Sequence, residues 1–134
     1  MSFCSSIGAN GATSSVRSRA ASGVLAAVLA LSAVAVCVAG PGSGWLAAAF
    51  AVGPDLALFA GMSSGLEKGQ LAPRAVPLYN AFHLYLGPLV LAAALAAGLL
   101  SPAWIGAALA WGAHVALDRA VGYGLRGRDG FQRA

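Results

Sequence analysis

Two long stretches without a charged side chain constrain the fold of this chain more than any other feature. One runs from Ala20 to Pro54, and the other runs from Ala75 to Leu117, where two histidines are the residues that titrate near neutral pH. Over the whole chain 59% of residues are hydrophobic and 9% are charged, whereas an ordinary soluble domain carries about 25% charged residues. We therefore expect a membrane protein.

Helix-breaking residues divide each uncharged stretch into two segments. Glycine and proline gather at residues 40–44, and Ser101-Pro102 interrupts the second stretch. The four segments lie near residues 21–40, 45–62, 76–100 and 102–125, each close to the roughly 17–25 residues that cross a bilayer as a helix. We predict an all-α transmembrane four-helix bundle over residues 20–126. Its many alanines and glycines allow close packing and would permit a homo-oligomer.

The basic residues outside these segments predict the topology. They precede the first segment, lie between the second and third, and follow the fourth: Arg17, Arg19, Lys68, Arg74, Arg126, Arg128 and Arg133. The positive-inside rule places these parts in the cytoplasm, with the chain in the bacterial inner membrane and both termini inside. Trp45 and Trp104 would then mark the outer interface. Because this topology explains the net charge of +4, we expect the lipid bilayer as a partner and no nucleic acid.

The two ends of the chain are predicted to lie outside the bilayer. Residues 1–19 are rich in serine, glycine and alanine without a periodic apolar pattern, which predicts a disordered cytoplasmic tail. Alternatively, Arg17, Arg19 and the first apolar segment form a secretory signal that ends near Cys37. Residues 127–134 are predicted to be a cytoplasmic C-terminal tail.

Four residues that can ionise lie inside the apolar segments: Asp55, His83, His114 and Asp118. Such a residue costs roughly 2.5–3.5 kcal/mol at membrane depth, so it normally faces a bundle interior and has partners there. Counting 1.5 Å of rise per residue from each cytoplasmic helix end places all four about 10–16 Å deep. They are therefore predicted to form one layer in the cytoplasmic half of the membrane.

This layer allows two kinds of chemistry. Two imidazoles and two carboxylates are a plausible ligand set for zinc or a non-haem transition metal, surrounded by Tyr79, Asn80 and Tyr85. Alternatively, the same groups form a network that handles protons or binds a small ligand, in which His114 pairs with Asp118 and Asp55 pairs with Asn80 or Arg119. If Arg119 does not reach Asp55, it extends to the cytoplasmic membrane interface. The catalytic candidates are the same four ionisable residues. The spacing of His114 and Asp118, at i and i+4, places them on one helix face but is a weak metal motif.

A proline precedes the first of these acids. Pro54 inside a helix removes a hydrogen bond and clashes with the preceding turn, which would free carbonyl groups near Phe50 and Ala51 at the depth of Asp55. A broken helix beside a buried acid is typical of binding sites in transporters, and a tolerated kink is the alternative. Pro88 is expected to kink the third segment.

The polar residues also fall into three ordered motifs. They read Pro54-Asp55-Leu56-Ala57, then Tyr79-Asn80-x-x-His83-x-Tyr85-x-x-Pro88, then His114-x-x-x-Asp118-Arg119-x-x-Gly122-Tyr123-Gly124-Leu125, followed by Gly130-Phe131. This pattern resembles the small bacterial membrane proteins of the domain of unknown function 4260 family. The resemblance implies a four-helix integral membrane protein without an assigned biochemical role, and its motifs mark Asn80, Arg119 and Tyr123 beside the four ionisable residues.

Two functions therefore stand open at this stage. In the first, the polar layer is a catalytic, transport or binding site for a small or membrane-associated ligand, with a divalent transition metal as the candidate cofactor. In the second, the protein is a non-enzymatic membrane scaffold or oligomerising bundle whose polar layer only fixes helix packing.

Overall fold

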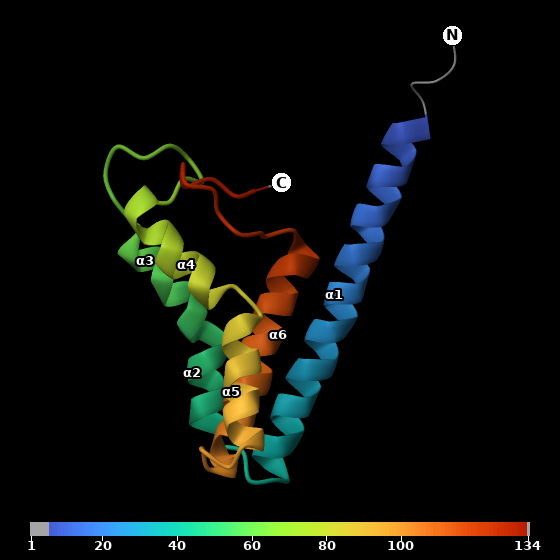
Figure 1. Ribbon diagram of the computed structural model, residues 1–134, viewed down its shortest axis with the longest axis vertical. Helices are drawn as coiled ribbons and strands as arrows, with labels where there is room; N and C mark the ends of the chain where they lie inside the picture. The colour runs from blue at the N-terminus through green and yellow to red at the C-terminus, as the bar shows by residue number, and fades with distance from the viewer. Residues whose placement is uncertain (1–5, 134) are drawn as a thin grey trace.

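The chain folds into four antiparallel helical arms (Figure 1), and the computed structural model describes residues 6–133. The first arm is a single helix, α1 (Ser6–Val38). The second comprises α2 (Gly44–Val52), the 3-10 turn η1 (Gly53–Asp55) and α3 (Leu56–Ala60). The third comprises η2 (Pro73–Ala75), α4 (Val76–Phe82) and α5 (Leu86–Ala96), and the fourth comprises η3 (Pro102–Trp104) and α6 (Ile105–Val121).

Each predicted segment corresponds to one arm, so the all-helical fold class is confirmed for the described residues. The predicted tail differs, because α1 already begins at Ser6 where disorder was expected over residues 1–19. Extending an existing helix by one residue is far less unfavourable than nucleating a new one, so the apolar part of α1 can carry the helix into a sequence of low helix propensity. Residues 1–5 of that expected tail lie outside the described residues.

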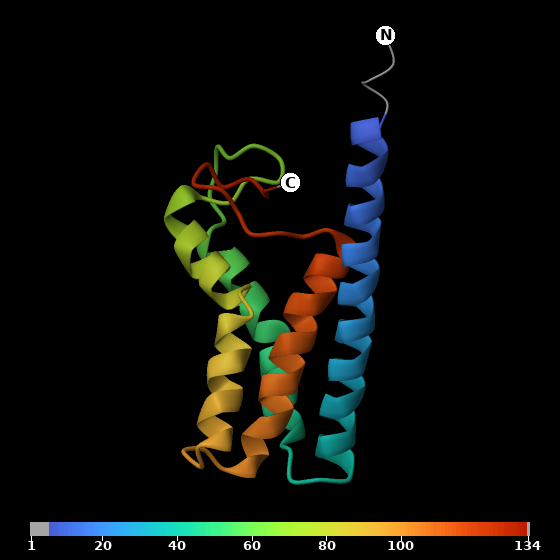
Figure 2. The same ribbon diagram turned by 45° about the vertical axis from the view of Figure 1, so that its right-hand side comes forward.

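α6 occupies the centre of the bundle (Figure 2) and packs against α1, α2 and α5. Its buried residues are all glycine or alanine apart from Val115. Small side chains let neighbouring helix backbones approach closely, which brings polar groups from different arms within reach of one another. Both described ends of the chain and the loop of residues 61–72 lie at the same end of the bundle (Figures 1 and 2).

Much of the outer surface is apolar. Large hydrophobic side chains such as Leu31, Phe59 and Leu99 are about 70% exposed or more, at 71%, 68% and 75%. Two helical stretches, Ser15–Val38 and Pro73–Ala96, are long and apolar enough to cross a membrane, by length and composition. Only 11% and 17% of their most apolar windows are buried, whereas the core helix of a soluble protein would be mostly buried.

Two of the four arms are broken, and each break lies next to a proline. Pro54 sits inside η1, and the 3-10 turn separates α2 from α3. Pro88 lies in the first turn of α5, and the chain leaves the helix over residues 83–85 just before it. Proline clashes with the carbonyl four residues earlier, which accounts for a break on its N-terminal side. The expected kinks are therefore present, and both lie at the level of the polar residues.

The segment after α6 closes one end of the bundle. Gly122 ends the helix with φ +93°, a left-handed conformation that favours glycine. The chain then crosses to the loop of residues 61–72, where the Leu71 N–H donates to the Gly130 carbonyl at 3.0 Å. Arg126 donates to the Gly69 and Gly130 carbonyls, both at 2.8 Å. These contacts tie the C-terminal segment to the second and third arms.

Candidate metal centre

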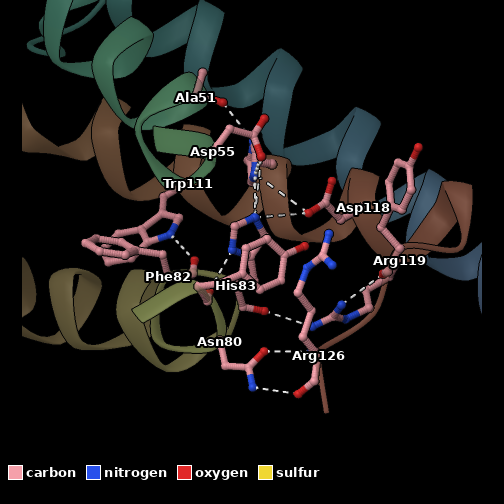
Figure 3. A network of polar contacts seen from close by, with 12 residues as sticks. Ala51, Asp55, Asn80, Phe82, His83, Trp111, Asp118, Arg119 and Arg126 are labelled. Carbon is pink, nitrogen blue, oxygen red and sulfur yellow. Dashed lines mark hydrogen bonds and ion pairs between the residues drawn. The ribbon is translucent and has the colours of Figure 1, made fainter. Parts of the chain in front are cut away.

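Four ionisable side chains from three arms meet at one point in the bundle (Figure 3). The Nε2 atoms of His83 and His114 lie 3.4 Å apart. One carboxylate oxygen of Asp55 lies 3.5 Å from Nε2 of His83 and 3.6 Å from Nε2 of His114. One carboxylate oxygen of Asp118 lies 3.4 and 3.7 Å from the same two nitrogens. The layer expected from helix depth alone is therefore a single contact cluster.

His83 owes its position to the break in the third arm. It is the residue that caps the C-terminal end of α4, and only 1% of it is exposed. Its Nδ1 lies 2.8 Å from the carbonyl oxygen of Tyr79, and its ring stacks on the Tyr79 ring with centroids 3.9 Å apart. These two contacts fix the ring plane, so Nε2 points towards the other members of the cluster (Figure 3).

His114 is held by the break in the second arm. Its Nδ1 lies 2.8 Å from the Ala51 carbonyl oxygen, one of the carbonyl groups that Pro54 was expected to free. A carbonyl inside an unbroken α-helix is already occupied by the N–H four residues later, so the η1 turn makes this acceptor available. The break near Asp55 is thus part of the architecture of the site.

The hydrogen-bond partners of the two rings determine where their protons lie. A carbonyl oxygen can only accept, so each Nδ1 must carry a hydrogen and donate it. In the neutral form of each ring, Nε2 is then a bare lone pair. The two Nε2 atoms lie 3.4 Å apart, with their lone pairs facing each other. Asp55 and Asp118 each place one carboxylate oxygen within 3.7 Å of both nitrogens. Four acceptor atoms converge, and a cation or added protons are needed to satisfy them.

The spacing of these atoms suits a small metal ion. The ligand atoms of Asp55, His83 and His114 all lie within 4.8 Å of one another, and their pairwise separations are 3.4, 3.5 and 3.6 Å. A tetrahedral ion with bonds of about 2.0–2.2 Å separates its ligands by about 3.3–3.6 Å. A histidine whose Nδ1–H donates to a backbone carbonyl is also the usual form of a metal-bound histidine. Asp118 is not a member of this group of three, although one of its oxygens lies 3.4 and 3.7 Å from the same two nitrogens.

The two carboxylates differ in access. The Asp55 side chain is 49% exposed and that of Asp118 is 16% exposed, while the His114 side chain is 9% exposed. The cluster is therefore closed on the histidine side and open at Asp55. A site with one accessible face can exchange an ion or admit a ligand, whereas a fully closed one serves structure alone.

The other residues marked by the sequence differ in their relation to the cluster. Tyr79 stacks on the His83 ring, as described above. Asn80 holds the C-terminal segment instead of a ligand: its amide donates to the Arg126 carbonyl at 2.9 Å and its oxygen accepts from the Arg126 N–H at 2.8 Å. Tyr85 lies half-buried in the break of the third arm, and the Tyr123 side chain is 54% exposed.

Arg119 makes a contact that the sequence did not suggest. The expected alternatives were the membrane surface or Asp55, but its guanidinium donates to the His83 carbonyl at 2.8 Å and to the Tyr123 carbonyl at 2.9 Å. It thus joins the end of α6 to the residue that carries a candidate ligand. Its neighbour Asp118 points to the cluster instead, in keeping with the turn of about 100° between consecutive helix residues.

Two residues of the surrounding network were not among the candidate site residues predicted from the sequence. Arg126 was assigned only to topology, yet its guanidinium lies 5.0 Å above the Tyr79 ring and its Nε is buried without a hydrogen-bond partner. Trp111 donates from its indole nitrogen to the Phe82 carbonyl at 2.8 Å and so secures the end of α4. A tryptophan in the middle of an apolar helix needs such an acceptor, which was the available signal.

A family model identifies the family of this chain. The model of the family described as "Domain of unknown function (DUF4260)" matches residues 22–134. The chain belongs to this family. The match confirms the resemblance drawn from the three motifs, and every member of the cluster in this DUF4260 chain lies within the matched residues. No curated protein matches the chain, and no solved structure matches it either.

Proposed function

We propose that this DUF4260 protein is a four-span integral membrane protein of the bacterial inner membrane, with both termini and the loop of residues 61–72 in the cytoplasm. Its exposed apolar side chains suit a hydrocarbon surrounding and would be unfavourable in water. The basic residues outside the helices belong to the end of the bundle that carries the termini, which matches the positive-inside rule. Trp45 belongs to the opposite end and is 72% exposed, as suits an interfacial anchor.

We further propose that Asp55, His83, His114 and Asp118 bind one divalent transition-metal ion. The observation that carries this proposal is the pair of Nε2 lone pairs facing each other at 3.4 Å between two carboxylates. Without a cation, the two ionised acids would leave charge uncompensated in a region of low dielectric constant. A doubly charged ion neutralises both acids and satisfies all four acceptors at once.

The donor set narrows the choice of ion. Imidazole nitrogen with carboxylate oxygen suits zinc and non-haem iron, whereas magnesium and calcium favour oxygen ligands alone. Zinc is the natural first probe because it accepts four-coordinate geometry with this ligand type. Ligation by Asp55, His83 and His114 alone, whose ligand atoms lie within 4.8 Å of one another, would leave a fourth position at which the ion acts as a Lewis acid on a small or membrane-associated ligand.

The competing function is a proton network. Protonating one or both imidazoles would also satisfy the four acceptors, because each Nε2–H could then donate to a carboxylate. The exposure of Asp55 is consistent with a proton network too, since a proton relay needs contact with water. A scaffold role would also require protonated imidazoles, because with both rings neutral the four atoms are all acceptors.

Metal content separates these functions. Protein purified in detergent without chelator should contain about one transition-metal ion per chain by elemental mass spectrometry. His83→Ala and His114→Ala should each lose it, while Tyr85→Phe, a substitution in the break beside His83, should keep it. If the wild-type chain neither retains a metal nor binds added zinc, the metal proposal is wrong and the proton network takes its place.

A further inference from the structure

A long groove lies against the candidate metal centre. It has a volume of about 760 Å³ and is lined by residues of α1, α2 and α6. Small-molecule sites in proteins measure about 300–1,000 Å³ and are mostly apolar, with a few polar groups that orient the ligand. The lining here is glycine, alanine, valine and leucine apart from Cys37 and His114. The groove therefore fits an apolar ligand that meets one titratable group.

The groove is elongated, as a hydrocarbon chain is. Along α1 its lining extends from Gly23 to Val38, which is roughly 22 Å at 1.5 Å of rise per residue. α1 packs closely on α6, whereas α1 and α2 make far less contact, so the groove is open between those two helices. An elongated, laterally open groove on an apolar surface admits a hydrocarbon chain from the bilayer more readily than a compact polar molecule.

Two residues connect the groove with the metal centre. His114 lines the groove, and so does Ala51, whose carbonyl accepts the hydrogen bond from Nδ1 of His114. The His114 side chain is 9% exposed, and its Nε2 faces other acceptors only. A molecule bound in the groove would thus lie alongside His114, one of the side chains proposed to bind the metal ion.

The end of the groove near Gly23 carries positive charge. Arg19 lies one helical turn before Gly23, and its guanidinium packs against Gly122, where an added Cβ would come within 2.8 Å of Nη2. Gly23 itself faces Ala120, with 3.8 Å between an added Cβ and the Ala120 Cβ. The Arg19 guanidinium therefore lies where α1 leaves the groove, at the end of the bundle that is proposed to face the cytoplasm.

We infer that the groove binds one acyl chain of an anionic membrane lipid, whose headgroup lies at Arg19. Arginine pairs well with a phosphate group, and the alanine-lined groove takes the chain. Gly122 and His114 are eight residues apart on α6, so the chain passes His114 roughly 12 Å below the headgroup. This inference rests on the proposed metal centre for one point, the class of ligand that passes beside His114: a lipid hydrocarbon chain.

Neighbouring alanines in α2 provide a matched test. Ala48 lines the groove and Ala49 does not, and both are exposed. Delipidated protein is titrated in detergent with phosphatidylglycerol and, separately, with phosphatidylcholine, and lipid adducts are counted by native mass spectrometry. Wild-type protein should bind one phosphatidylglycerol about tenfold more tightly than phosphatidylcholine, a difference of about 1.4 kcal/mol. Ala48→Phe should weaken phosphatidylglycerol binding at least about tenfold, Ala49→Phe should leave it unchanged, and Arg19→Gln should remove the preference for the anionic lipid.

The zinc content of each variant is measured in parallel. Ala48→Phe should keep its zinc, because it changes no ligand of the proposed ion. If wild-type protein holds zinc but Ala48→Phe and Ala49→Phe bind lipid equally, the groove inference is wrong and the metal centre stands. If instead a dimer is present that Ala48→Phe dissociates, a second copy of the chain occupies the groove and the lipid inference is overturned. Lipid binding by a chain that takes up no zinc would overturn the metal centre and support the groove inference.

Discussion

At the scale of single residues, the site depends on which atoms carry hydrogen. Both Nδ1 atoms face backbone carbonyls, at 2.8 Å from Tyr79 and 2.8 Å from Ala51. This leaves both Nε2 atoms and both acids as acceptors, so the cluster is unfavourable when empty and favourable when it holds a cation. The effect of a substitution on stability should therefore reverse sign between the metal-free and the metal-bound protein.

Asp118→Asn tests this reversal. The substitution removes one of two converging negative charges at nearly constant volume, so the metal-free protein should unfold at a higher temperature than wild type. The zinc-bound protein should unfold at a lower temperature, since a carboxylate ligand is lost and zinc affinity should fall at least about 100-fold. Thermal unfolding in detergent, with and without zinc, measures both. Asp129→Asn in the C-terminal turn is the matched control and should change neither; a lower unfolding temperature of metal-free Asp118→Asn would contradict the account.

Asn80 should behave as a structural residue. Its side chain makes two hydrogen bonds with the backbone of Arg126, at 2.9 and 2.8 Å, and makes none with the cluster. Asn80→Ala should lower the free energy of unfolding by about 1–3 kcal/mol, because it leaves two backbone groups unpaired. Its zinc content per folded chain should equal that of wild type. Loss of zinc at unchanged stability would instead place Asn80 in the site.

At the scale of the elements, two breaks supply the groups that the site needs. η1 frees the Ala51 carbonyl for His114, and the break over residues 83–85 places His83 at the end of α4. Trp111 and Arg119 of α6 bind carbonyl groups of Phe82 and His83 at 2.8 Å each. The broken arm is thus fixed to the central helix on both sides of the candidate ligand.

Pro54→Ala tests the contribution of the first break. A continuous helix would return the Ala51 carbonyl to an intrahelical bond and leave Nδ1 of His114 without its acceptor. Zinc affinity should then fall by about 10–100-fold, the range seen when the hydrogen-bond partner of a metal-bound histidine is removed. Pro102→Ala, the same change at the start of η3, should bind zinc as wild type does. Unchanged affinity in Pro54→Ala would mean that η1 has no part in the site.

The sequence predicted the four helical segments and the layer that holds the four ionisable residues, because apolar length and helix rise determine both. It also predicted the kinks at Pro54 and Pro88. It could not predict the partners of Asn80, which depend on how the C-terminal segment folds back over the bundle. The contact of Arg119 with the His83 carbonyl depends instead on the break over residues 83–85. The helical residues between Ser6 and Arg19 were missed for a related reason: composition describes local preference, whereas an existing helix extends past it.

At the scale of the whole molecule, the arrangement of the arms places both ends and the loop of residues 61–72 together (Figure 1). The proposed topology makes this the cytoplasmic end. Reporters fused after Ala134 and inserted between Ser63 and Gln70 should both report a cytoplasmic location. A reporter inserted near Gly98, in the connection at the opposite end, should report the periplasm. A periplasmic signal from the C-terminal fusion would contradict the four-span topology.

The central claim is that two histidines and the two acids hold one metal ion inside this bundle. X-ray absorption at the zinc edge, on wild-type protein loaded with one equivalent of zinc and returned to lipid, tests it most directly. Zinc bound by these side chains should be surrounded by nitrogen and oxygen atoms at about 2.0–2.2 Å. The spectrum should also contain the outer-shell scattering of two imidazole rings. His114→Ala should lose this spectrum, because the variant should no longer hold the ion at this site. A shell of oxygen atoms alone, a sulfur scatterer, or a spectrum unchanged in His114→Ala would contradict it.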